Sequence, residues 1–334
     1  MPRPPAPLPA TLAGVFTVAQ ASAMNVSPGR LTARDLARPF RGVRVRGQPS
    51  ARDAAATTER EPGSPDELAR EAILARMRAH SLVLPPHAFY VGAAALAAHG
   101  LPFLDASEAE TAPLEVAVFA PHRALRRPGI AAFRVQPGLA HTVTQDGLRV
   151  ASPASLWALL ARDHSTHDLI RIGDAMVRIP RDDWGRRHPE WQLVSIDRLG
   201  AAIDAGRRLG AAALREALPQ LRTGSMSVLE TDWRLGLSGT GLPEPELDVE
   251  VRSPQGRLLG ISDAAFPAYR VAVEIEGDHH RTSRRQWTRD LQKYADYAAI
   301  GWEVVRLASS HIRPARRTDV EMVAAALTRR GWRG

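Results

Sequence analysis

The sequence predicts a mixed α/β (α+β) protein, and three observations support this fold class. From about residue 225 onward, helical and strand-like segments alternate in the order α-β-β-β-α-β-α. The front and the middle of the chain also combine short helices with short apolar strands. The 334 residues are 44% hydrophobic and 24% charged, a balance that argues against a disordered or fibrous chain.

The charge is concentrated at the two ends of the chain. Residues 1–61 hold nine basic and four acidic residues, and residues 281–334 hold twelve and five, whereas the region between them is net acidic. Two basic ends predict contact with a polyanion such as DNA. Of the 44 basic residues that accompany 36 acidic ones, only Lys293 is a lysine.

Composition also predicts the compartment. The chain has no cysteine, which excludes disulfides and thiolate metal sites and fits a reducing environment. No apolar run approaches the roughly 18 residues that span a bilayer, and no secretory signal pattern begins the chain. We therefore expect a cytoplasmic protein with no membrane partner.

The N-terminal region predicts a small DNA-binding module. Residues 1–12 are rich in Pro and Ala and are expected to be disordered. In residues 13–47, Thr17 can cap a helix over 18–24, a turn and a second helix over 30–36 follow, and 40–46 alternates apolar and basic residues. This is the order of a winged helix-turn-helix. Its arginines are candidate DNA contacts or simply surface charge: Arg30, Arg34, Arg41, Arg44 and Arg46.

The middle of the chain predicts structure but no function. Residues 48–66 have the composition of a linker. A mixed α/β region over 67–223 follows. Its expected elements are a helix over 67–80, strands over 114–119 and 131–135, a helix over 153–162, and alternating helical segments and turns over 168–223.

Residues 224–334 carry the candidate chemistry. Glu230 lies in the first turn of a helix, Asp263 on the second strand, and Glu274 and Glu276 on the third strand, where their spacing of two places both on one face. Acids crowded near paired strands repel each other unless a divalent cation lies between them. The pattern therefore predicts a site for Mg²⁺ or Mn²⁺, whereas Asp248 and Glu250 alternate along the first strand and are expected to face water.

The spacing of this region resembles a known family. Asp263, Glu274-x-Glu276-Gly277-x-x-His280, Gln286-Trp287-x-x-Asp290 and Gly301-Trp302-x-Val304-x-Arg306 resemble a domain-of-unknown-function family related to very-short-patch-repair endonucleases, within the PD-(D/E)XK superfamily. The resemblance covers about residues 225–312 and implies a restriction-endonuclease-like core, α-β-β-β-α-β. It matches Glu230 to the helix glutamate, Asp263 to the metal-binding aspartate, Glu274 and Glu276 to the acidic pair, and His280 to the histidine after the glycine turn. Residues 10–47 resemble the winged-helix module of AbiEi-type antitoxin regulators.

One position departs from the superfamily. Glu276 stands where the general motif has a lysine that orients the attacking water or stabilises the developing charge. Lys293, on the following helix, could substitute if it faces the site. Otherwise His280, with its near-neutral pKa, would act as acid and base.

Three functions follow from these patterns, and the third is a repair or mobile-element nuclease that acts on a mismatched or structured substrate. The first is a Mg²⁺- or Mn²⁺-dependent DNA endonuclease in which Glu230, Asp263, Glu274, Glu276 and His280 are catalytic. The alternative is a non-catalytic DNA-binding regulator, antitoxin-like, with a nuclease fold as scaffold and an unidentified toxin or other protein as partner. Further candidates for DNA contact or for the site itself are Arg281, Arg284, Arg285, His279, Gln286 and Lys293.

Overall fold

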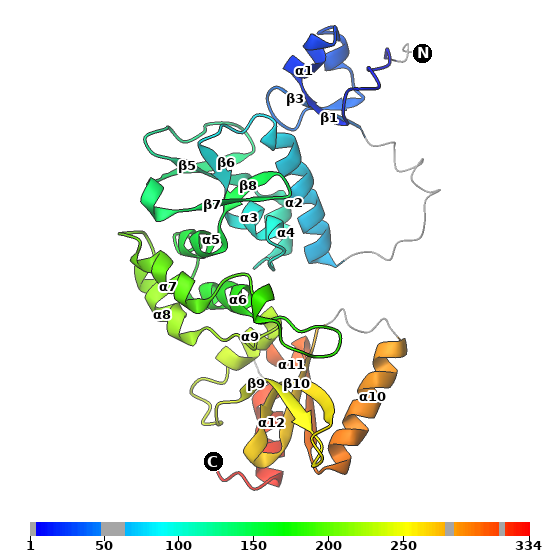
Figure 1. Ribbon diagram of the computed structural model, residues 1–334, viewed down its shortest axis with the longest axis vertical. Helices are drawn as coiled ribbons and strands as arrows, with labels where there is room; N and C mark the ends of the chain where they lie inside the picture. Colours follow the sequence, from blue (N-terminus) through cyan, green and yellow to red (C-terminus); the bar gives the residue numbers. More distant parts are fainter. Residues whose placement is uncertain (1–4, 48–63, 278–283, 314–317) are drawn as a thin grey trace. The chain divides into compact units, whose positions relative to one another are not determined.

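The computed structural model describes residues 5–47, 64–277, 284–313 and 318–334, with the backbone alone described for 284–289 (Figure 1). It confirms a mixed α/β protein with three sheets. The chain divides into two compact units, residues 1–160 with 202–209, and residues 161–201 with 210–334. Each unit is described by itself.

The first unit begins with a three-stranded antiparallel sheet in the order β1-β3-β2. Thr17 caps the following helix because its hydroxyl accepts the N–H of Gln20, while the Gln20 side chain accepts the N–H of Thr17. The elements are β1 (Val15–Thr17), α1 (Val18–Ala23), the 3₁₀ turn η1 (Arg30–Thr32), β2 (Leu36–Ala37) and β3 (Val43–Arg46).

The second predicted helix of this module, over residues 30–36, is wrong. The chain makes only the single turn Arg30–Thr32 and then enters strand β2. Leu31 and Leu36 are both buried, but a spacing of five does not place two side chains on one face of an α-helix. The end of the supposedly disordered tail also packs, since Leu12 is buried and its carbonyl accepts the Arg46 guanidinium at 2.9 Å.

The rest of the first unit is a five-stranded mixed sheet in the order β6-β5-β4-β8-β7. The expected helix over 67–80, the strands over 114–119 and 131–135, and a helix from residue 153 are all present. The elements are α2 (Pro65–Ser81), β4 (Ala88–Tyr90), α3 (Gly92–Ala98), α4 (Ala106–Thr111), β5 (Leu114–Phe119), β6 (Ile130–Val135), β7 (Thr142–Gln145), β8 (Leu148–Ala151) and α5 (Pro153–Leu160).

The second unit contains a four-stranded sheet in the order β12-β11-β10-β9. Strands β9, β10 and β11 are antiparallel, and β11 pairs with β12 in parallel. The predicted order α-β-β-β-α-β-α is confirmed, with one short helix added before the last. The elements are α6 (Thr166–Val177), α7 (Ile196–Asp204), α8 (Ala211–Ala217), α9 (Val228–Leu235), β9 (Glu246–Arg252), β10 (Leu258–Phe266), β11 (Val271–Glu276), α10 (Arg284–Ala299), β12 (Glu303–Ala308), α11 (Ser309–Ile312) and α12 (Asp319–Arg329).

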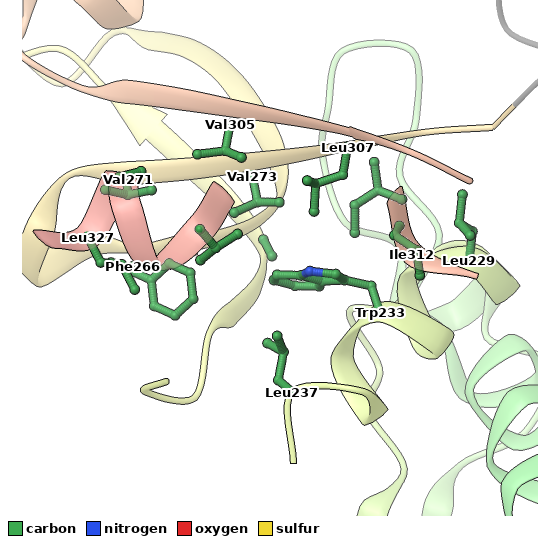
Figure 2. Packing of buried hydrophobic residues seen from close by; sticks show 14 residues of the cluster. Leu229, Trp233, Leu237, Phe266, Val271, Val273, Val305, Leu307, Ile312 and Leu327 are labelled. Atoms are coloured by element: carbon green, nitrogen blue, oxygen red, sulfur yellow. The ribbon is translucent and has the colours of Figure 1, made fainter. Parts of the chain in front are cut away.

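Both faces of this sheet are covered. On one face, Trp233 of α9 lies between Leu237 and the side chains of Val273 and Leu307 (Figure 2). On the other face, Tyr297 of α10 packs with Val251 and Ala272. Alternation along β11 therefore directs Val271, Val273 and Ile275 to the α9 face and leaves Glu274 on the α10 face. Within the described part of the chain, no helix combines the length and the apolar composition needed to cross a membrane.

Trp233 is fully buried in this core, so we expect Trp233→Ala to lower the free energy of unfolding by about 3–5 kcal/mol. Urea unfolding followed by circular dichroism measures the change. The matched control is Trp184→Ala, because Trp184 is 73% exposed and its truncation should change stability by about 0.5 kcal/mol or less. Equal losses in the two variants would contradict the packing described.

Candidate active site

The candidate site lies where the backbone pairing of β10 and β11 ends and a side chain of β10 hydrogen-bonds to the backbone of β11. These strands pair from Phe266↔Val271 to Ala264↔Val273. At the next position the Oδ2 atom of Asp263 accepts the N–H of Ile275 at 2.6 Å. The carboxylate thus takes the place of a backbone acceptor and is fixed beside Glu274 on the neighbouring strand.

Lys293 of α10 faces this site. Its Nζ atom lies 2.7 Å from Oε2 of Glu274 and donates to the Ile261 carbonyl at 2.6 Å. Glu274 is only 7% exposed, and its Oε1 atom has no hydrogen-bond partner among the described residues. The orientation of Lys293, which the sequence left open, is therefore towards Glu274.

Glu230 approaches from helix α9. The Ser227 hydroxyl caps the helix by accepting the N–H of Glu230, and the Glu230 Oε2 atom accepts the N–H of Met226 at 2.8 Å. Burial, reinforced by the negative charge of Asp263, raises the pKa of Glu230 to about 8. This residue of the first helical turn is therefore a buried acid within electrostatic reach of Asp263.

The two strand carboxylates are also shifted towards the protonated form. Burial raises the pKa of Glu274 to about 7, although the Lys293 ammonium opposes the shift. Burial likewise raises the pKa of Asp263 against the hydrogen bond from Ile275 and the charge of Lys293. Three carboxyls that resist ionisation together form a site that favours added positive charge.

Glu276 lies at the edge of this cluster. Its Oε1 atom accepts the Nε–H of Arg306 at 2.6 Å, and the Arg306 guanidinium lies 5.3 Å from the ring centre of Tyr294. The prediction that Glu276 shares a face with Glu274 agrees with this placement on the α10 side. Glu276, however, forms an ion pair with Arg306, whereas Glu274 forms one with Lys293.

The donor set fits a hard divalent cation held by few protein ligands. Among the residues that the structure describes, no three carboxylate or imidazole groups are placed to hold a metal ion together. Asp263 and Glu274 still offer carboxylate oxygens, and the Glu274 Oε1 atom is buried without a hydrogen bond. Mg²⁺ is often bound by one or two carboxylates, with waters and substrate phosphate completing its coordination. The residues present are compatible with that arrangement.

Several residues that the sequence predicts for the site lie outside the part of the chain that the structure describes. His279, His280 and Arg281 fall between the described ranges, so no contact is assigned to them. Arg284, Arg285 and Gln286 belong to the first turns of α10, and only their backbone is described.

The expectation that Asp248 faces water is wrong. Asp248 is 4% exposed, and its two oxygens bind the Nε atoms of Arg181 at 2.7 Å and Arg187 at 2.8 Å. Arg181 also reaches Glu250 at 2.8 Å, and that carboxylate remains partly exposed. These arginines precede Asp248 by 67 and 61 residues, so spacing along the chain gave no signal of the contact.

Three of the N-terminal candidate arginines bind within the protein. Arg30 pairs with Asp35 at 2.6 Å, Arg44 donates to the Leu31 carbonyl at 2.8 Å, and Arg46 donates to the Leu12 carbonyl. These contacts stabilise the small sheet module. The two candidates that remain exposed are Arg34 and Arg41.

Comparison with known proteins gives a partial similarity. No family model matches the chain, and no solved structure matches it. An uncharacterised protein of Mycobacterium tuberculosis strain H37Rv is 32% identical over 112 residues, which are 34% of this chain and 41% of that protein. An uncharacterised protein of strain CDC 1551 matches to the same extent. The chain thus spans about two-fifths of the length of these relatives.

Lys293→Met should leave Glu274 buried beside no ammonium group. At pH 8, where Glu274 is ionised, we expect a loss of about 3 kcal/mol in the free energy of unfolding, and at pH 5 a smaller loss because Glu274 is protonated. Urea titrations at the two pH values measure the difference. The double variant Lys293→Met with Glu274→Gln is the matched control, and its loss relative to Glu274→Gln should be the same at the two pH values. A pH-independent loss in the single variant would count against the ion pair.

Glu230 should make the protein less stable as the pH rises. Its pKa is about 8 in the folded state and near 4.5 in the unfolded chain, so between these values the folded state binds more protons. The stabilisation is complete below about pH 4.5 and is lost as the pH rises through 8, by an amount on the order of 1–3 kcal/mol. Unfolding free energies from pH 5 to 9 should fall less steeply in Glu230→Gln than in the wild type. Parallel curves would show that Glu230 ionises normally.

Proposed function

We propose that this protein is a Mg²⁺- or Mn²⁺-dependent DNA endonuclease whose site is formed by Asp263, Glu274 and Lys293. The observation that carries the proposal is the contact of Lys293 with Glu274 at 2.7 Å. This contact lies beside Asp263, whose carboxylate accepts a backbone N–H of β11. An acid pair can hold a divalent cation that activates water, and an adjacent lysine can stabilise the charge that develops on the phosphate. The resemblance to PD-(D/E)XK nucleases and the element order of the second unit support the same core.

Each residue has a distinct role in this proposal. Asp263 and the unpaired Oε1 atom of Glu274 would hold the cation. When bound, the cation would activate a water molecule for attack on phosphorus. The Lys293 ammonium, fixed by two acceptors, would stabilise the negative charge that develops on the phosphate. Glu230 remains protonated near neutral pH and could hold or deliver a proton next to Asp263.

A second candidate function, that of a DNA-binding regulator, is supported by two exposed arginines. Arg34 and Arg41 are exposed on the N-terminal module. A DNA-binding regulator, antitoxin-like and bound to an unidentified protein partner, would use these arginines and leave Asp263 without a role. Such a protein would bind DNA with an affinity that falls steeply with salt.

The distinguishing prediction concerns Asp263→Ala. With plasmid DNA and Mg²⁺, we expect cleavage by the wild type and a loss on the order of 100-fold or more in the variant, because a cation ligand is removed. Glu244→Ala is the matched control, since the Glu244 side chain is 71% exposed. Gel quantification of nicked and linear plasmid measures the rates.

Equal cleavage by wild type and Asp263→Ala would refute the assigned site. DNA binding without cleavage by either protein, together with weaker binding by Arg34→Ala plus Arg41→Ala, would instead support the regulator.

A further inference from the structure

A hairpin outside the resemblance carries two exposed aromatic rings. Residues 181–191, here the Trp184 hairpin, follow α6, and Arg181 and Arg187 form an isolated antiparallel bridge across it. The Asp182 carboxylate accepts the N–H groups of Trp184 at 3.0 Å and Arg186 at 2.8 Å. The turn is therefore held in a defined shape by its own hydrogen bonds.

The hairpin is anchored next to the candidate site. Arg181 and Arg187 both bind the buried carboxylate of Asp248 on β9. Gly185 lies so close to β10 that a Cβ atom would come within 2.8 Å of the Ile261 side chain, and its φ of +81° also favours glycine. The carbonyl of the same Ile261 accepts the Lys293 ammonium, and Asp263 lies two residues further along. A strand held by the hairpin would therefore be close to the acid pair.

The aromatic side chains of the hairpin point to solvent. Trp184 is 73% exposed and Trp191 is 54% exposed. The Arg186 guanidinium lies 5.4 Å from the ring centre of Trp184, and His188 stacks on Trp191 with ring centres 3.9 Å apart. Indole rings this exposed gain little stability from burial, and they are accessible to a ligand that stacks.

Two partly exposed arginines beside these rings can contact an anionic ligand. The side chains of Arg186 and Arg187 are 73% and 47% exposed, whereas Asp182 and Asp248 are turned inward at 10% and 4%. Asp183 and Glu190 are also exposed, and Glu190 pairs with His188 at 2.7 Å, so the groups of the hairpin that can bind an anion are Arg186 and Arg187. Arg257, 70% exposed, precedes Leu258, which Gly185 also approaches.

We propose that the Trp184 hairpin binds a single DNA strand by stacking its bases on Trp184 and Trp191, with Arg186 and Arg187 contacting the phosphates. Exposed aromatic rings interleaved with arginine are the usual means of holding unpaired nucleotides without sequence preference. The inference rests on the proposed endonuclease function for the role of the bound strand, which the hairpin presents to Asp263 and Glu274. It extends that function by assigning unpaired DNA as the substrate feature recognised.

The test is the affinity of the full-length protein for a fluorescein-labelled thymidine oligonucleotide in EDTA, measured by anisotropy. We expect Trp184→Ala to weaken binding about 10-fold and Trp184→Ala with Trp191→Ala to weaken it further, whereas Trp184→Phe keeps most of the affinity. Leu209→Ala is the control, because Leu209 is 71% exposed and belongs to the other unit. Unchanged affinity in the double tryptophan variant, or no binding by the wild type, would overturn the inference.

This assay separates the inference from the nuclease proposal. EDTA prevents metal-dependent cleavage, and Glu244→Ala, at a side chain that is 71% exposed, should bind the oligonucleotide as the wild type does. Weaker binding in Trp184→Ala supports the stacking surface even if plasmid cleavage is never observed. Cleavage that depends on Asp263, with tryptophan variants that bind as tightly as the wild type, would overturn the stacking surface alone.

Discussion

The ion pair between Lys293 and Glu274 is the interaction on which the candidate site depends. It joins α10 to the middle of the sheet, and the same ammonium binds the Ile261 carbonyl on β10. Both side chains are mostly removed from water, with exposures of 17% and 10%. A buried ion pair of this kind contributes little net stability but makes the loss of either partner costly. The ion pair is therefore better explained as a means of placing the Lys293 ammonium beside Asp263 and Glu274 than as a source of folding stability.

The burial of three acids at the candidate site explains why positive charge is favourable beside them. Glu230, Asp263 and Glu274 come from three elements and all have pKa values above their ordinary range, chiefly because they are desolvated. One lysine cannot neutralise three carboxylates. The remaining negative charge is stabilised either by protonation, as the pKa of Glu230 indicates, or by a metal ion. A site of this kind changes its proton content when a cation binds, which couples metal affinity to pH.

Much of the second unit could be predicted from its sequence, because alternation along β11 and the turns between strands are local signals. Asp263 and Glu274 were assigned to neighbouring strands in this way. The position of Lys293 could not be, since it depends on how α10 rotates against the sheet. The inward turn of Asp248 was missed because its partners, Arg181 and Arg187, are distant in sequence and because a φ of +53° changes the alternation at that residue. In the N-terminal module, Leu31 and Leu36 suggested a helix, but burial of both required a turn followed by a strand.

Asp248 also connects the candidate site with the Trp184 hairpin. Its negative charge contributes to the raised pKa values of both Glu230 and Asp263, so it lies within electrostatic reach of the acids. Arg181 and Arg187 bind both of its oxygens. The carboxylate that fixes the hairpin therefore also acts on the charge of the candidate site, so the surface proposed to hold DNA and the acids proposed to cleave it share a single carboxylate.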